Sequence, residues 1–146
     1  LDFEGMDLFE AGWKFHAWCD MRREEILNKY DFYSLKGANA IDPTAKLVED
    51  EVLYDEYKNW EKLRYVLNNP PLIKTNLDVS QETVERWFAI LAKYFEKKPD
   101  DRTMKIFLSK QSSNKEEIKE IIDGVQKLRQ NQKAVEILKK VKEEIV

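Results

Sequence analysis

Residues 71–96, PLIKTNLDVSQETVERWFAILAKYFE, contain the clearest helical signal in the chain. Asp78 or Ser80 can cap the free amides of a first turn, and Gln81 follows Asp78 by three residues. Apolar residues then recur at i, i+3, i+4, i+7 and i+11, the period of one helix face. They are Val84, Trp87, Phe88, Leu91 and Phe95, and we expect Trp87, Phe88 and Leu91 to be mostly buried.

A short apolar segment at 72–77 and a tight turn at 77–79 precede this helix. The order of short helix, turn and longer helix is typical of a helix-turn-helix, which makes 71–96 a candidate DNA-reading stretch. The start of the second helix would then offer Gln81, Thr83 and Arg86 to base edges, and Ser80 to a phosphate. The residues at the spacing that buries the two helices against each other are Ile73, Leu77, Val79, Val84 and Trp87.

Several residues of this stretch favour a plainer interpretation. Lys74 and Asp78 occupy positions where the motif usually has a small residue and a glycine, and Glu82 and Glu85 would face DNA with negative charge. The alternative is a capped core helix that follows a proline-rich loop, and the residues leave both interpretations open.

The rest of the chain predicts further helices and no strands. We expect helices at 6–30, at about 43–67 behind Asp42 as cap, and after Pro99, where Met104, Phe107 and Leu108 would make the apolar contacts. Residues 113–146 are amphipathic, begin with a capping box at 113–116 and restart at Asn131. The fold class is therefore all-α: a helical bundle of five to six helices, with a core domain at 1–110 and a C-terminal helical hairpin or arm at 111–146.

Composition excludes several classes of protein. Hydrophobic residues make up 42% of the chain and charged residues 36%, so it is neither disordered by composition nor embedded in a membrane. We see no secretory signal and expect a soluble, cytoplasmic protein. The single cysteine, Cys19, excludes an intramolecular disulfide, and the single histidine, His16, is expected in the core. No nucleophile–base pair or ligand cluster is visible, so we expect no enzymatic activity, cofactor or metal.

Charge is unevenly distributed along the sequence. Residues 1–71 carry a net charge of −6, residues 72–110 carry +2, and residues 111–146 carry +1. An acidic run at 49–56 is expected to be a solvated helix face, with a metal-ion role as the alternative. A positive surface for a phosphate backbone could come only from the middle and the end of the chain. The basic residues expected there are Lys93, Lys97, Lys98, Arg102 and Lys105.

Residues 7–72 resemble part of the small subunits of phage terminases. An aromatic helix ends in a tyrosine, a loop with Gly37 leads to Asp42-Pro43, and a helix bearing Trp60-Glu61-Lys62-Leu63-Arg64 runs into Pro70-Pro71-Leu72. The resemblance implies a viral helical protein that assembles into a ring, recognises DNA for packaging and has no catalytic activity of its own.

Three functions follow as hypotheses. The leading one is a non-enzymatic, oligomeric DNA-binding protein in viral DNA recognition or replication, whose subunits assemble through 113–146. Leu138, Val141 and Ile145 would form the apolar edge of that contact. The second is a protein-interaction module that uses exposed aromatic residues such as Trp13, Trp18 and Trp60. The third is a helical accessory domain of a primase or another replication enzyme, which would hold a single strand by stacking and by lysines.

Overall fold

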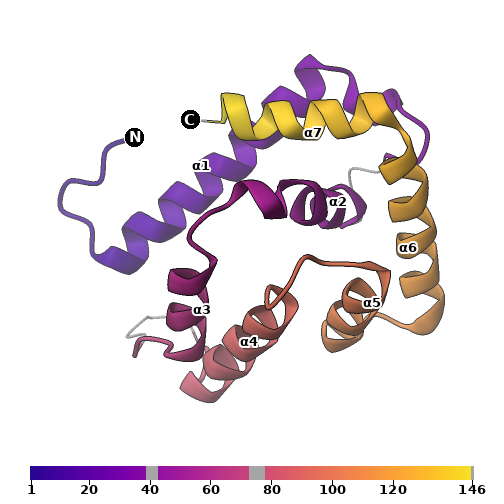
Figure 1. The fold of residues 1–146 in the computed structure, drawn as a ribbon. Coiled ribbons are helices and arrows are strands. Elements are labelled where there is room, and N and C mark those ends of the chain that lie inside the picture. Colours follow the sequence, from indigo (N-terminus) through magenta and orange to yellow (C-terminus); the bar gives the residue numbers. More distant parts are fainter. Residues whose placement is uncertain (39–42, 73–77, 146) are drawn as a thin grey trace.

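The fold is all-helical, as the sequence predicts (Figure 1). The computed structural model describes residues 1–38, 43–72 and 78–145, and these contain seven α-helices and two short 3-10 helices, with no strand among them. The α-helices are α1 (Leu8–Lys29), α2 (Thr44–Leu53), α3 (Trp60–Asn68), α4 (Gln81–Tyr94), α5 (Asp101–Lys110), α6 (Lys115–Gln130) and α7 (Gln132–Glu144). The 3-10 helices are η1 (Phe32–Ser34) and η2 (Tyr54–Glu56).

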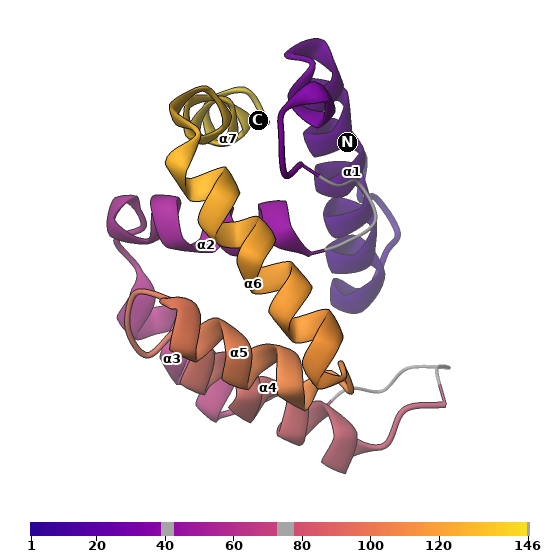
Figure 2. The same ribbon diagram turned by 90° about the vertical axis from the view of Figure 1, so that its right-hand side faces the viewer.

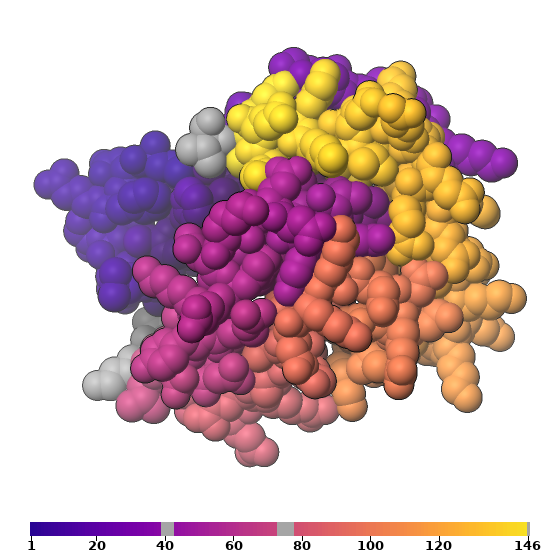
Figure 3. Space-filling view, in the orientation of Figure 1, coloured from indigo at the N-terminus to yellow at the C-terminus, as the bar shows by residue number. Residues whose placement is uncertain are grey.

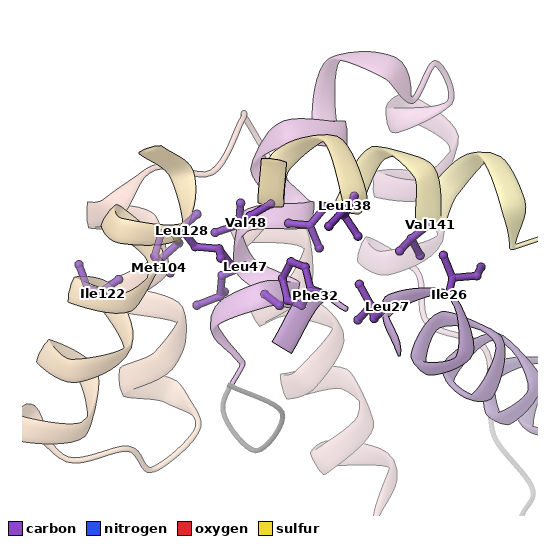
Figure 4. Packing of buried hydrophobic residues seen from close by; sticks show 14 of the residues in the cluster. Ile26, Leu27, Phe32, Leu47, Val48, Met104, Ile122, Leu128, Leu138 and Val141 are labelled. Carbon is purple, nitrogen blue, oxygen red and sulfur yellow. The ribbon is translucent and has the colours of Figure 1, made fainter. Parts of the chain in front are cut away.

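The short helix α2 lies at the centre of the molecule. Pro43, whose ring fixes φ near the helical value, precedes it as the N-cap residue and was expected one position later, inside the helix. Asp42, the expected cap, lies outside the described residues. Leu47 and Val48 of α2 are fully buried, and α2 packs against both α6 and α7 (Figure 2). Figure 4 shows the core as one cluster that runs from Ile26 and Val141 at one end to Ile122 at the other.

The single helix expected at 43–67 is wrong, because the chain leaves helical geometry after η2. Tyr57 has an extended backbone, and α3 begins again at Trp60. The Trp60 indole N–H donates to the carbonyl of Tyr54 at 2.9 Å, and its ring stacks on Tyr54 and on Phe95 at centroid distances of 4.3 and 5.3 Å. These aromatic contacts with a distant part of the chain stabilise the break.

The stripe expected to bury α4 is only partly buried. Trp87 is 39% exposed, and Phe88 and Leu91 are half-buried. The buried residues of α4 are Ala92 and Tyr94 instead. The expectation for Trp87 was wrong because α4 lies at the edge of the molecule and packs mainly against α3 and α5, which leaves part of the Trp87 ring exposed.

Helices α6 and α7 complete the core. Asn114 and Glu117 form the capping box of α6, one residue later than expected, and Asn131 caps α7 by accepting the amide of Ala134. Leu138 and Val141 are buried against α1 and α2. The apolar edge that we assigned to a partner chain is thus covered within this chain.

Helix α1 is buried at one end and exposed at the other. Asp7 and Glu10 form a capping box at its start, and Arg23, Ile26 and Leu27 bury its second half. The first half projects from the body of the molecule (Figure 1). His16 lies there with its side chain 65% exposed, 3.4 Å from Asp20, so the expected core position was wrong. Among the described residues no helix is long and apolar enough to cross a membrane.

Candidate nucleic-acid interface

The start of α4 carries the four residues expected to read DNA. The Ser80 hydroxyl accepts the amide of Thr83 at 3.1 Å and bonds the Thr83 hydroxyl at 2.8 Å, so these two side chains cap the helix. The Gln81 side chain donates to the carboxylate of Glu85 at 3.3 Å. Arg86 is exposed. Of the four, therefore, Ser80, Gln81 and Thr83 already serve the helix itself.

The packing expected of a helix-turn-helix is not present in the described part of the stretch. Val79 is 51% exposed and Trp87 is exposed as well, so neither is buried between two helices. Ile73 and Leu77, the other apolar positions of the first helix and turn, lie outside the described residues, as does Lys74. The preceding helix in the sequence that packs against α4 is α3.

A groove between α4 and α5 gathers three of the expected phosphate contacts. Its volume is about 590 Å³, and its apolar floor includes Tyr94 and Phe107, whose rings stack at a centroid distance of 4.2 Å. Four cationic and two acidic side chains line it, which gives a net charge of +2. The charged lining residues are Lys93, Lys97, Arg102, Lys110, Glu96 and Asp100.

The two acids of this α4–α5 groove are held charged by local partners. Lys93 pairs with Glu96, and its hydrogen bond lowers the pKa of that carboxyl. The backbone amide of Thr103 donates to Asp100 at 2.8 Å and likewise lowers the pKa of that carboxyl. Lys97, Arg102 and Lys110 remain against the single charge of Asp100, so a net charge of +2 faces an anion in the groove.

A second basic hollow lies on the other side of α5. Its volume is about 330 Å³, and Lys105, Lys115 and Lys119 line it between α5 and α6, together with one acid, Asp123. We call the two hollows and the ridge of α5 between them the α5 face; α5 and α6 lie toward the viewer in Figure 2. Its cations are Lys93, Lys97, Arg102, Lys105, Lys110, Lys115 and Lys119, against the acids Glu96, Asp100 and Asp123.

Sequence reasoning missed three of these cations and misplaced one. Lys110, Lys115 and Lys119 were not expected at the site, although Lys115 and Lys119 stand one helical turn apart and could have been recognised from that spacing. Lys98 was expected beside Lys97, but it turns away and binds Asp55 at 2.5 Å. The carboxylate of Asp55 therefore already neutralises Lys98, outside the α5 face.

The acidic run at 49–56 is the electrostatic centre of the fold. The expected solvated face is wrong for Glu49, Asp50 and Glu51, which are largely covered, whereas Asp55 and Glu56 are exposed. Each carboxylate meets a partner from a different element. Glu49 binds Arg23 of α1, Asp50 accepts from Tyr94 of α4, Glu51 binds Arg129 of α6, Asp55 binds Lys98, and Glu56 binds Lys142 of α7.

Asp50 links this centre to the α4–α5 groove. The Tyr94 hydroxyl donates to its carboxylate at 3.1 Å, while the Tyr94 ring forms part of the groove floor. Burial raises the pKa of Asp50 to about 7, although the bond from Tyr94 opposes the shift. Burial and the neighbouring carboxylate also raise the pKa of the Tyr94 phenol. Both groups are buried on the core side, so they shape the groove and present no charge to it.

The alternative for the acidic run, a metal-ion site, would need several ligands close together. Within residues 1–38, 43–72 and 78–145, no group of three or more histidine, cysteine, aspartate or glutamate side chains lies close enough together to hold an ion.

Comparison of the chain with protein-family models, with curated protein sequences and with solved structures finds no match. The resemblance of residues 7–72 to terminase small subunits therefore stays a prediction from the sequence.

Proposed function

We propose that this protein is a non-enzymatic DNA-binding protein that holds the sugar-phosphate backbone against its α5 face. The observation that carries the proposal is that seven cationic side chains, against three acids, line the two hollows that border α5, in a chain whose net charge is −3. Neutralised phosphates dominate the affinity of proteins for nucleic acids, and such clustering offsets an acidic overall charge.

The arrangement of the cations supports contact with phosphates over two rows. Lys97 and Lys110 line one hollow, Lys105 and Lys119 line the other, and the ridge of α5 separates them by the width of a helix, about 10 Å. Arg86 lies on the same helix as Lys93, seven residues earlier, and extends the first row toward the exposed ring of Trp87. That ring offers a surface on which an unpaired base could stack.

The test is a salt titration of DNA binding with a charge-matched control. Lys97→Ala together with Lys110→Ala should weaken binding of all sequences alike and should reduce the slope of log K against log salt by about 2, since each lost phosphate contact removes about 0.9. The control is Lys98→Ala together with Lys133→Ala, which removes the same charge outside the α5 face. Equal losses in both double variants, or no DNA binding of the wild type at 50 mM salt, would contradict the proposal.

Comparing duplex with single strands separates the two nucleic-acid hypotheses. Trp87→Ala should weaken binding of a single strand by about 1–3 kcal/mol if a base stacks there, and should leave duplex affinity nearly unchanged. Arg86→Ala should weaken duplex binding by about 1–3 kcal/mol and relax the preference at one base position only if the start of α4 reads base edges.

A second candidate function is protein binding, and a separate observation favours it. The first half of α1 exposes large apolar side chains outside the α5 face, among them Leu8, Trp13 and Phe15. Exposed apolar patches of this kind mark interaction sites on soluble proteins.

A further inference from the structure

The first 21 residues, here the N-terminal arm, continue a core-facing stripe beyond the core. Leu8, Phe15 and Cys19 precede the buried Ile26 by 18, 11 and 7 residues, so they lie along the same side of α1. Leu8 is nevertheless 95% exposed and Phe15 46% exposed, and on another side of the helix Phe9 is 39% exposed and Trp13 65% exposed. In Figure 3 the arm forms one edge of the molecule, in indigo.

The arm exposes two large aromatic side chains that can anchor a specific contact. Phe9 and Trp13, four residues apart, share one side of α1, and their exposed parts amount to roughly 250 Å² when full side-chain areas of about 200–250 Å² are assumed. Two aromatic side chains of this size can anchor a contact at its centre.

Charge narrows the choice of partner. The arm contains five acidic side chains, at positions 2, 4, 7, 10 and 20, against the single base Lys14. DNA and anionic lipid surfaces would repel it. A symmetric contact between two arms would bring two surfaces of charge −4 together. The arm fits a basic surface with an apolar floor, and the α4–α5 groove has both properties.

We propose that the N-terminal arm of one copy of this chain docks in the α4–α5 groove of a second copy. Trp13 and its aromatic neighbours would cover the groove floor at Ile106 and Phe107, and the acidic residues of the arm would face Lys97 and Lys110. A volume of about 590 Å³ lies in the range of about 300–1,000 Å³ typical of ligand pockets, so the groove accepts a few side chains and not a whole helix.

The contact must form between copies, because the arm is rigidly held away from its own groove. Helix α1 is continuous from Leu8 to Lys29, and its second half is fixed by buried apolar residues and by the ion pair of Arg23 with Glu49 at 2.5 Å. Figure 1 shows the first half of α1 extending away from α5. Arm and groove are different surfaces, so the association is head-to-tail, and each copy offers one of each.

The experiment is sedimentation equilibrium of the full chain at low salt, without nucleic acid. The arm variant is Phe9→Ala with Trp13→Ala, and the groove variant is Lys97→Glu with Lys110→Glu. We expect the wild type to self-associate, and each variant alone to associate at least tenfold more weakly. An equimolar mixture of the two variants should restore association as a 1:1 dimer, because the groove variant keeps its arm and the arm variant keeps its groove.

Three results would overturn the proposal. The first is a wild type that stays at 17.4 kDa up to about 500 μM. The second is a groove variant that associates as strongly as the wild type. The third is a mixture of the arm and groove variants that stays monomeric. The second result would assign the contact to a pair of arms. Circular dichroism checks that the variants are folded, and a second pair, Trp13→Ser and Ile106→Ser, repeats the test at exposed apolar positions without adding charge. Because no DNA is present, failure here leaves the proposed DNA binding untouched, and failure of DNA binding leaves this contact untouched.

Discussion

At the residue scale, Asp50 is the most unusual group in the molecule. Its carboxyl lies on the side of α2 that faces the core and accepts one hydrogen bond from Tyr94. Burial raises the pKa of this carboxyl to about 7. An unfolded aspartate titrates near 3.9, so between pH 4 and pH 7 the folded protein binds a proton that the unfolded chain does not. The contribution of Asp50 to stability is therefore complete below about pH 4 and is lost as the pH rises through 7.

Replacing Asp50 by asparagine should remove this dependence. Asparagine keeps an acceptor for the Tyr94 hydroxyl and abolishes the buried charge, so the free energy of unfolding at pH 8 should increase by a few kcal/mol, with about 4 as the ceiling for three pKa units. Urea unfolding from pH 4 to pH 8 measures the effect. Asp55→Asn, at an exposed carboxylate paired with Lys98, is the control and should leave the pH dependence of the wild type in place.

At the element scale, α4 and α7 show where an apolar stripe does and does not form a core. Leu138 of α7 is fully buried between α1 and α2, while Leu91 of α4 is half-buried at the edge of the molecule. Leu138→Ala should cost about 2–5 kcal/mol, and Leu91→Ala should cost clearly less, since its site can partly refill with water. Thermal or chemical unfolding of the two variants checks this order, and the reverse order would show that α4 belongs to the core.

Removal of α7 extends the same point. Truncation after Asn131 deletes Ala134, Ile137, Leu138 and Val141, all of which are buried in the core. We expect the shortened chain to lose its cooperative unfolding transition, and a chain that kept it with a lower molecular mass in solution would restore α7 as an assembly element.

The sequence predicts well those features of the helices that depend on residues close together in the chain. The caps at Ser80 and Asn131 depend on a side chain and an amide three residues away. Ser80 is one of the two caps expected for α4, and α7 begins after the restart expected at Asn131. The break before Trp60 depends on Phe95, and the burial of Glu49 depends on Arg23. Such partners, between 26 and 86 residues apart in the acidic run, leave no periodic trace in the sequence. The basic residues of the α5 face were predictable one helix at a time, whereas their convergence from α4, α5 and α6 was not.

At the scale of the whole molecule, the two proposals share one surface. DNA on the α5 face and the arm of a second copy would both occupy the α4–α5 groove, so they should compete. A short duplex added to the self-associated protein should dissociate it. Each complex with DNA should then contain one protein chain, and the fraction dissociated should follow the amount of DNA bound. Sedimentation velocity with labelled DNA measures both masses at once. If the protein stays self-associated when DNA binds, the DNA contact and the contact between copies lie on separate surfaces.

The acidic run also has a consequence for synthesis of the chain. Residues 49–56 are made early, yet their partners include Arg129 and Lys142, which leave the ribosome much later. At a typical rate of about 5–20 residues per second, the run waits several seconds for these partners. At the start of that interval, α2 lacks its neighbours α6 and α7, and Arg23 is the one partner of the run that has been made, so the other carboxylates of the run stay hydrated. The same charges that later join five segments of the fold would thus protect the nascent chain from premature collapse.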